Sequence, residues 1–178
     1  VSAGKAIKGT ALGSASADSS AMDLNSTSEV FADQTVVIPA DTLLAGDVVD
    51  FTGFIALSES SSSANVTLRI RLDAASGTDA IIASHIISNY QNNDFIRFTG
   101  RFTVRSVGAT GSIVGETLIA GTGAGSAVSS MYVFNGSTAQ TLNTTAAVTM
   151  KISAQCDAAD AGNGAVVRNL NITRFSAA

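Results

Sequence analysis

The chain has 178 residues, of which 13% are charged and 46% are hydrophobic, and its formal net charge is -4. This length fits one domain with an appendage and can bury a substantial core. The acidic balance argues against bulk attraction to nucleic acid or to an anionic membrane. Because Ser, Thr, Gly and Ala fill the surface in place of ions, covering it with another subunit costs little desolvation. The composition therefore favours a component of an assembly.

Residues 1–26 are rich in Gly, Ala and Ser without a sustained period, which predicts an extended N-terminal arm. Such a segment buries too little apolar area to order itself, so we expect something outside the domain to hold it. The segment lacks the apolar stretch of roughly 7–15 residues found in a secretory signal. No window approaches the roughly 20 apolar residues that span a bilayer. We predict an arm over 1–26 and a domain over 27–178, made in a host cytoplasm and without a membrane partner.

From about residue 28 apolar and polar residues alternate, which is typical of strands that bury one face. Pro39 follows Ile38, where a strand could end. Strands are predicted over 34–38, 47–57, 65–73, 79–88, 94–105, 111–120, 129–135, 146–155 and 165–175. The alternation places Val49, Phe51, Ile55, Leu57, Val66, Leu68, Ile70, Leu72, Ile96, Phe98, Phe102 and Val104 in the core.

About eight strands with turn-forming spacers predict an all-β fold, an antiparallel sandwich. The jelly roll is the commonest eight-stranded solution, so we expect a jelly-roll β-sandwich with the extended N-terminal arm. In a jelly roll the strands sort into two sheets. One sheet would hold 47–57, 165–175, 79–88 and 129–135, and the other 65–73, 146–155, 94–105 and 111–120.

This sorting would gather six of the ten cationic residues on the outer face of the second sheet. One interpretation is that Arg and Lys at exposed strand positions merely keep sheets soluble. The other is a basic face that docks on an acidic partner surface. Together with two lysines of the arm, these are the candidate partner-binding residues: Lys5, Lys8, Arg69, Arg71, Arg97, Arg101, Arg105 and Lys151.

Residues suited to catalysis are few. The only histidine, His85, lies in an apolar run and is best interpreted as a polar residue on a half-buried strand. Cys156, the only cysteine, continues the inward parity of Val148, Met150 and Ile152, which indicates core packing. The acidic residues fall mainly in loops. We therefore predict no catalytic residues, no metal site, no cofactor and no enzymatic activity.

The stretch 156–164, CDAADAGNG, is predicted to be the turn between the last two strands. Asp157, Asp160 and Asn163 should keep it solvated, and calcium binding remains a weak alternative because EF-hand spacing is absent. The glycine-rich stretch 121–127 lacks the Lys-Ser/Thr ending of a phosphate loop, which favours a flexible loop. A chain without Trp and with only two Tyr is poorly equipped for sugar stacking, although a lectin is not excluded.

Two segments, DFIRFTGRFTVRSVGATG over 94–111 and TAAVTMKISAQCDAADAGNG over 145–164, resemble small structural proteins of tailed bacteriophages and prophages. The likeness covers about the last 130 residues. In that group an aromatic commonly fills the place of Cys156, and Pro that of Ala161. The resemblance implies a jelly-roll protein of the virion, such as a head decoration (cement) protein or a tail and fibre component, and brings no catalytic residues.

These observations predict a virion protein that decorates the outer capsid shell and stabilises it through its arm and one sheet face. Its partners would be the major capsid protein and copies of itself, in a homotrimer, with no nucleic acid. The alternative is a tail-fibre or adhesin head that binds a host surface glycan. A small hydrolase ranks last.

Overall fold

A computed structural model of the chain describes residues 8–59, 64–74, 79–123, 126–133 and 139–176. These residues form strands and connecting turns, with no helix among them. The strands are β1 (Lys8–Ala15), β2 (Met22–Asp23), β3 (Val30–Phe31), β4 (Val36–Ile38), β5 (Val48–Ser58), β6 (Val66–Ala74), β7 (Asp79–Ile87), β8 (Phe95–Ser106), β9 (Ser112–Gly123), β10 (Ser126–Val133), β11 (Gln140–Thr141), β12 (Val148–Cys156) and β13 (Gly164–Ser176).

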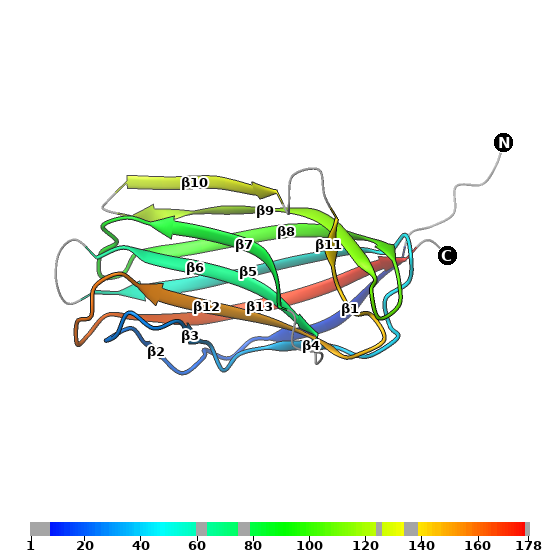
Figure 1. Cartoon of the computed structure of the whole chain (residues 1–178). Coiled ribbons are helices and arrows are strands. Elements are labelled where there is room, and N and C mark those ends of the chain that lie inside the picture. The colour runs from blue at the N-terminus through cyan, green and yellow to red at the C-terminus, as the bar shows by residue number, and fades with distance from the viewer. Residues whose placement is uncertain (1–7, 60–63, 75–78, 124–125, 134–138, 177–178) are drawn as a thin grey trace.

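Two antiparallel sheets pack against each other, and Figure 1 shows them as two layers. The larger, sheet A, has the order β1-β13-β5-β8-β9-β10, with β11 beside β9 and β2 beside β13. The smaller, sheet B, has the order β3-β12-β6-β7, with β4 also beside β12. The predicted all-β, antiparallel sandwich is thus confirmed.

The core lies between the sheets and follows the predicted alternation. The inward residues of β5, β6, β8 and β12 are buried, with relative exposures of 3% or less. Burying a large apolar side chain contributes roughly 1.5–3 kcal/mol, so this shared interior is the main favourable term for the fold. The twelve core positions predicted from the alternation are all buried.

The predicted strands from residue 47 onward are present, with ends shifted by at most three residues. The predicted strand 34–38 is β4, and it ends at Ile38 directly before Pro39. The short strands β2, β3 and β11 were not predicted, nor was β1. The stretch 121–127 was predicted to be a flexible loop, and this is wrong for residues 121–123 and 126–127. They belong to β9 and β10, which form a hairpin in which Gly123 pairs with Ser126.

The predicted distribution of strands between the sheets is wrong. β8 pairs with β5 in sheet A, and β7 pairs with β6 in sheet B. As a result β8 and β9 lie in the opposite sheet from β6 and β12, which the jelly-roll arrangement had placed beside them.

A repeated tripeptide, Phe-Thr-Gly, accounts for the pairing of β5 with β8. It occurs at 51–53 and at 98–100, and the antiparallel register sets Phe51 opposite Gly100 and Gly53 opposite Phe98. A Cβ placed on either glycine would lie 2.2 Å from the Cζ atom of the facing ring. Each phenylalanine thus covers the glycine of the other strand, and the two rings lie 6.5 Å apart.

The N-terminal segment is part of the sandwich from residue 8 onward. β1 pairs along the edge of β13, from Lys8 opposite Ser176 to Ala15 opposite Leu170. Leu12 and Ala15 pack against the core. The expectation that something outside the domain must order the arm is therefore wrong for β1, because the backbone of β13 supplies its hydrogen-bond partners.

Candidate functional site

The predicted basic face does not exist as one surface, because its residues lie on opposite sides of the molecule. Sheet B carries Arg69 and Arg71 on β6 and Lys151 on β12, whereas sheet A carries Arg97, Arg101 and Arg105 on β8. The error follows from placing β8 in the wrong sheet. Of the arm lysines, Lys8 begins β1, and Lys5 lies outside the described residues.

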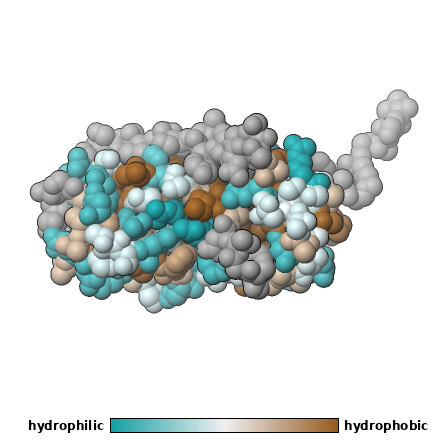
Figure 2. Space-filling view, in the orientation of Figure 1, coloured by the Kyte–Doolittle hydropathy of each residue, from teal (hydrophilic) through white to brown (hydrophobic). Residues whose placement is uncertain are grey.

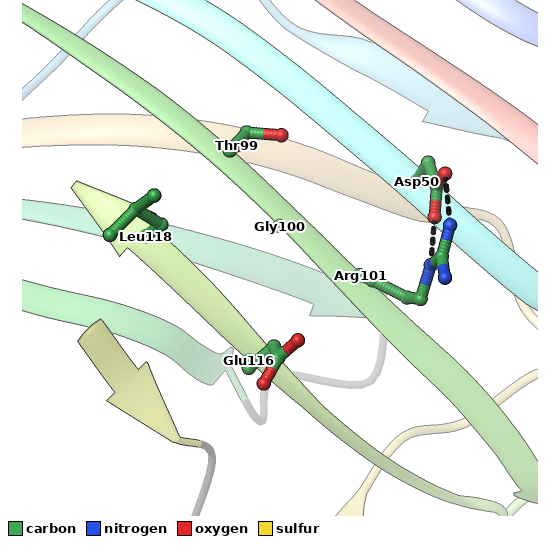
Figure 3. A pocket seen from close by; sticks show the side chains of 6 residues that line it. All are labelled: Asp50, Thr99, Gly100, Arg101, Glu116 and Leu118. Atoms are coloured by element: carbon green, nitrogen blue, oxygen red, sulfur yellow. Dashed lines mark hydrogen bonds and ion pairs between the residues drawn. The ribbon is translucent and has the colours of Figure 1, made fainter. Parts of the chain in front are cut away.

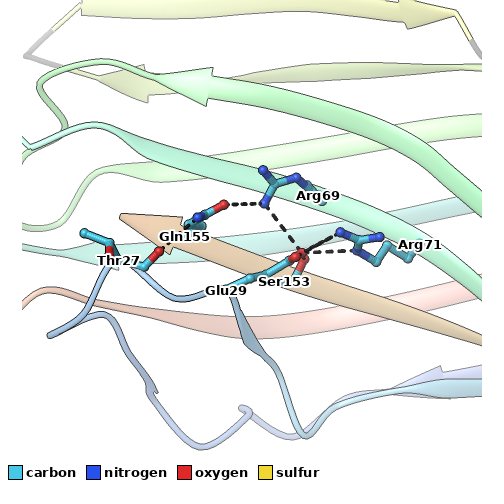
Figure 4. Close-up of polar contacts among 6 residues, drawn as sticks. All are labelled: Thr27, Glu29, Arg69, Arg71, Ser153 and Gln155. Carbon is cyan, nitrogen blue, oxygen red and sulfur yellow. Dashed lines mark hydrogen bonds and ion pairs between the residues drawn. The ribbon is translucent and has the colours of Figure 1, made fainter. Parts of the chain in front are cut away.

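On the outer face of sheet B, Glu29 forms ion pairs with two of these arginines (Figure 4). Arg71 donates to its carboxylate from Nε at 3.1 Å and from Nη2 at 2.9 Å, and the Arg69 guanidinium lies 3.5 Å away. Ser153 faces outward by its place in the alternation of β12, but it is buried, and its Oγ donates a hydrogen bond to Glu29. Gln155 joins the cluster by accepting from Arg69 and donating to the Thr27 carbonyl. The segment before β3 is thereby held across the sheet.

The residues of this cluster lower the pKa of the Glu29 carboxyl. Burial by itself would raise its pKa, but the hydrogen bonds from Ser153 and Arg71 and the charges of Arg71 and Arg69 hold it below the ordinary value of 4.5. Glu29 is therefore ionised at neutral pH. The two arginines share this one carboxylate, so the cluster keeps one unbalanced positive charge.

Exposed apolar side chains lie on the same outer face. Phe31, Val37 and Ile86 are 44%, 49% and 60% exposed. In the strand register they lie opposite Ser153, Thr149 and Thr67, which occupy outward-facing positions of β12 and β6. Figure 2, in the orientation of Figure 1, shows apolar surface interspersed with polar surface where sheet B faces the viewer.

Phe31 links these apolar residues to the cations. The guanidinium of Arg71 lies 5.9 Å from its ring centroid, and Lys151 Nζ lies 6.0 Å from it. Lys151 is in turn paired with Asp73. The face thus combines apolar side chains with charges that are already paired within the chain, which lowers the cost of removing it from water.

The outer face of sheet A has a different chemistry, because β-sheet register sets its side chains in transverse rows. One row holds Asn169, Phe54, Arg97 and Ala120, from β13, β5, β8 and β9. The next two rows hold Asn171, Thr52, Thr99 and Leu118, then Thr173, Asp50, Arg101 and Glu116.

Arg101 and Asp50 form a bidentate ion pair on this face (Figure 3). Arg101 Nε and Nη2 donate to the two carboxylate oxygens at 2.6 and 2.8 Å. The hydrogen bond and charge of Asp50, with a contribution from Glu116, raise the pKa of the guanidinium. The pair lines a shallow depression of about 330 Å³ together with Thr99, Glu116 and Leu118.

Arg97 lines a second hollow on the same face. Two adjoining depressions of about 280 and 270 Å³ share Thr52, Arg97 and Asn171 in their linings. Within the described residues, no carboxylate lies within ion-pair distance of Arg97. Arg105, near the far end of β8, is likewise exposed and unpaired among those residues.

The stretch 156–164 is the turn between β12 and β13, as predicted, and Cys156 is buried as predicted. Asn163 departs from the prediction of a solvated side chain, because it is 2% exposed and its Nδ2 donates to Cys156 Sγ at 3.6 Å. Asp157 accepts from the backbone and side chain of Asn65. No cluster of three or more His, Cys, Asp or Glu suited to a metal ion occurs in the described ranges.

Groups with possible chemical reactivity have structural roles in their surroundings. His85 lies half-buried on β7, and burial lowers its pKa, which favours the neutral imidazole. Asp47 and Asp94 are buried carboxylates that sequence analysis passed over. Each accepts a backbone N–H three residues earlier, from Leu44 at 2.8 Å and from Gln91 at 2.7 Å, and so stabilises a turn.

Sequence analysis also missed the residues around Arg97. Phe54 and Phe95 stack on the surface of sheet A, and their ring centroids lie 5.6 Å apart. Both residues alternate with inward residues of β5 and β8, so the alternation in the sequence implies that they face outward. Asn169 and Asn171 come from β13, where a bulge at Val167/Asn169 shifts the register. The outward Phe pair was the available signal, but recognising the site required the pairing of β5 with β8.

No protein-family model matches the chain, and no curated protein matches its sequence. No helix in the described part of the chain is long and apolar enough to cross a membrane. The observed architecture defines the chain as an antiparallel β-sandwich, and the two sheet faces are its candidate interaction surfaces.

Proposed function

We propose that the chain is a virion structural protein of the capsid-decoration type, which attaches to the capsid shell through the outer face of sheet B. The observation that carries this proposal is the exposure of Phe31, Val37 and Ile86 among cations that are paired with Glu29 and Asp73. Apolar anchors surrounded by satisfied polar groups are typical of the central part of protein interfaces. Attachment would stabilise the shell by adding buried contact area.

The predicted basic docking face is replaced in this proposal by an apolar one. Arg69, Arg71 and Lys151 lie on the attachment surface, but each is already paired with a carboxylate of the chain. They would therefore shape the interface and would contribute little long-range attraction. The resemblance of segments 94–111 and 145–164 to phage structural proteins supports the virion setting, as does the low charge content. Self-association as a homotrimer belongs to the same proposal, because several copies multiply weak contacts.

The second candidate is a tail-fibre or adhesin head that binds a host glycan. The two adjoining depressions around Arg97 form a groove on sheet A, and this groove favours the second candidate. Its amide, hydroxyl and aromatic side chains are suited to a polar ligand.

Location and copy number distinguish the two candidates. Gold-coupled antibodies raised against the purified chain would be applied to virions released from the cells that produce the chain, and the particles would be viewed by electron microscopy. We expect label over the whole shell, corresponding to hundreds of copies. Label confined to the tail tip would support the fibre head, and virions without label would contradict both candidates.

A further inference from the structure

The guanidinium of Arg97 is available to an external anion. It is exposed, and no carboxylate of the described residues lies within ion-pair distance of it. Asp50 lines the same hollow, but both of its oxygens accept from Arg101. A planar guanidinium binds a carboxylate through two parallel hydrogen bonds.

The lining around Arg97 adds neutral hydrogen-bonding groups. Asn169 and Asn171 are exposed, and no hydrogen bond within the described residues engages their side-chain amides. The hydroxyls of Thr99 and Thr173 line the same hollow, and Thr52 keeps acceptor capacity while it donates to the Phe98 carbonyl at 3.1 Å. Amides and hydroxyls can both donate and accept, as the hydroxyls of a sugar do.

An aromatic side chain, Phe54, lines one of the two depressions together with Arg97. Phe54 lies directly opposite Arg97 in the register and stacks on Phe95 at an interplanar angle of 29°. Phe95 is 43% exposed, so the pair presents apolar surface beside a cation and two amides. A pyranose ring has the matching combination, with an apolar C–H face and hydroxyls around its edge.

We propose that this groove binds a saccharide that carries a carboxylate. Arg97 binds the carboxylate, the amides of Asn169 and Asn171 bind ring hydroxyls, and Phe54 contacts the apolar face of the sugar. The two adjoining depressions, which share Arg97, suit a ligand longer than one ring. A nucleic acid or an acidic peptide fits less well, because each is bound best by several unpaired cations and Arg97 is the one cation among the described residues of the two linings.

The inference does not depend on where the protein resides, because the groove is on sheet A and the proposed attachment surface is on sheet B. Its failure would leave the attachment proposal standing, and the reverse also holds.

The test is a titration of the full-length ¹⁵N-labelled chain followed by NMR. The probes are tetragalacturonate and 3′-sialyllactose, each compared with a neutral counterpart, the methyl-esterified tetramer and lactose. We expect at least one acidic probe to bind about tenfold or more tightly than its neutral counterpart and to shift the side-chain amide signals of Asn169 and Asn171. Arg97→Gln should weaken that binding about tenfold or more.

Arg105→Gln is the matched control, because it removes the same charge from the same strand and face but lies outside the groove. It should change affinity by less than about twofold at moderate salt, where distant charges are screened. The spectrum of each variant verifies that it is folded. The proposal is overturned if neither acidic probe binds more tightly than its neutral counterpart, or if both variants weaken binding equally. Equal displacement by sodium acetate would also overturn it, because the groove would then recognise a carboxylate without the sugar.

Discussion

Glu29 controls the charge of the sheet B face through a handful of short contacts. Its carboxylate receives hydrogen bonds from Arg71 and Ser153 and lies 3.5 Å from Arg69. The side chains of Glu29 and Arg71 are 24% and 14% exposed, so this pair is less screened than a surface ion pair. Removing the carboxylate would take this ion pair away from both arginines.

Glu29→Gln should lower the free energy of unfolding by about 1–2 kcal/mol at pH 7. The pKa of Glu29 is lower in the folded chain than its ordinary value of 4.5. Its stabilising contribution is therefore complete above that value and is lost as the pH falls through the lowered pKa. Urea unfolding of both proteins at pH 7 and well below pH 4.5 measures this. The difference should disappear in acid, and a difference independent of pH would contradict the assigned role.

Parity along single strands was sufficient to predict the apolar core positions of the main strands. Cys156 and the inward residues of β6 and β8 were placed correctly from alternation alone. Ion pairs such as Arg101 with Asp50 could not be predicted in this way. Arg101 and Asp50 lie 51 residues apart in the sequence, so their contact depends on which strands are neighbours in the sheet.

Strand pairing was the step at which prediction from sequence failed. Alternation places a residue inside or outside but does not specify the neighbouring strand. The two Phe-Thr-Gly tripeptides contained that information, since a glycine on one strand makes room for a ring on the next. Composition misled the prediction for β1 in a similar way, because small residues suit an edge strand with few bulky contacts as well as they suit a free arm.

Deleting residues 1–15 removes β1 and exposes the backbone edge of β13. Leu12 also loses its contacts with the core, so we expect a loss of about 1–3 kcal/mol in unfolding free energy. Deleting residues 1–7 is the control, because it leaves β1 in place. Thermal and urea unfolding of both truncated chains measures the effect. Equal stability of the two would show that β1 contributes nothing to the sandwich.

At the scale of the whole molecule, the sandwich presents two faces with different chemistry. Sheet B offers Phe31, Val37 and Ile86 among paired charges, and sheet A offers Arg97, unpaired among the described residues, in a groove of amides and hydroxyls. A protein attached through sheet B would leave the groove of sheet A accessible. The central claim is therefore that the outer face of sheet B is the attachment surface.

The most direct test uses shells that have been stripped of the chain and then rebound with purified variants, with occupancy measured by cryo-electron microscopy. Ile86→Ser removes an apolar side chain that is 60% exposed on sheet B, and Leu118→Ser removes one that is 41% exposed on sheet A. We predict that Ile86→Ser weakens binding to the shell about tenfold or more and that Leu118→Ser leaves it unchanged. Full occupancy by the Ile86 variant together with loss of the Leu118 variant would contradict the account.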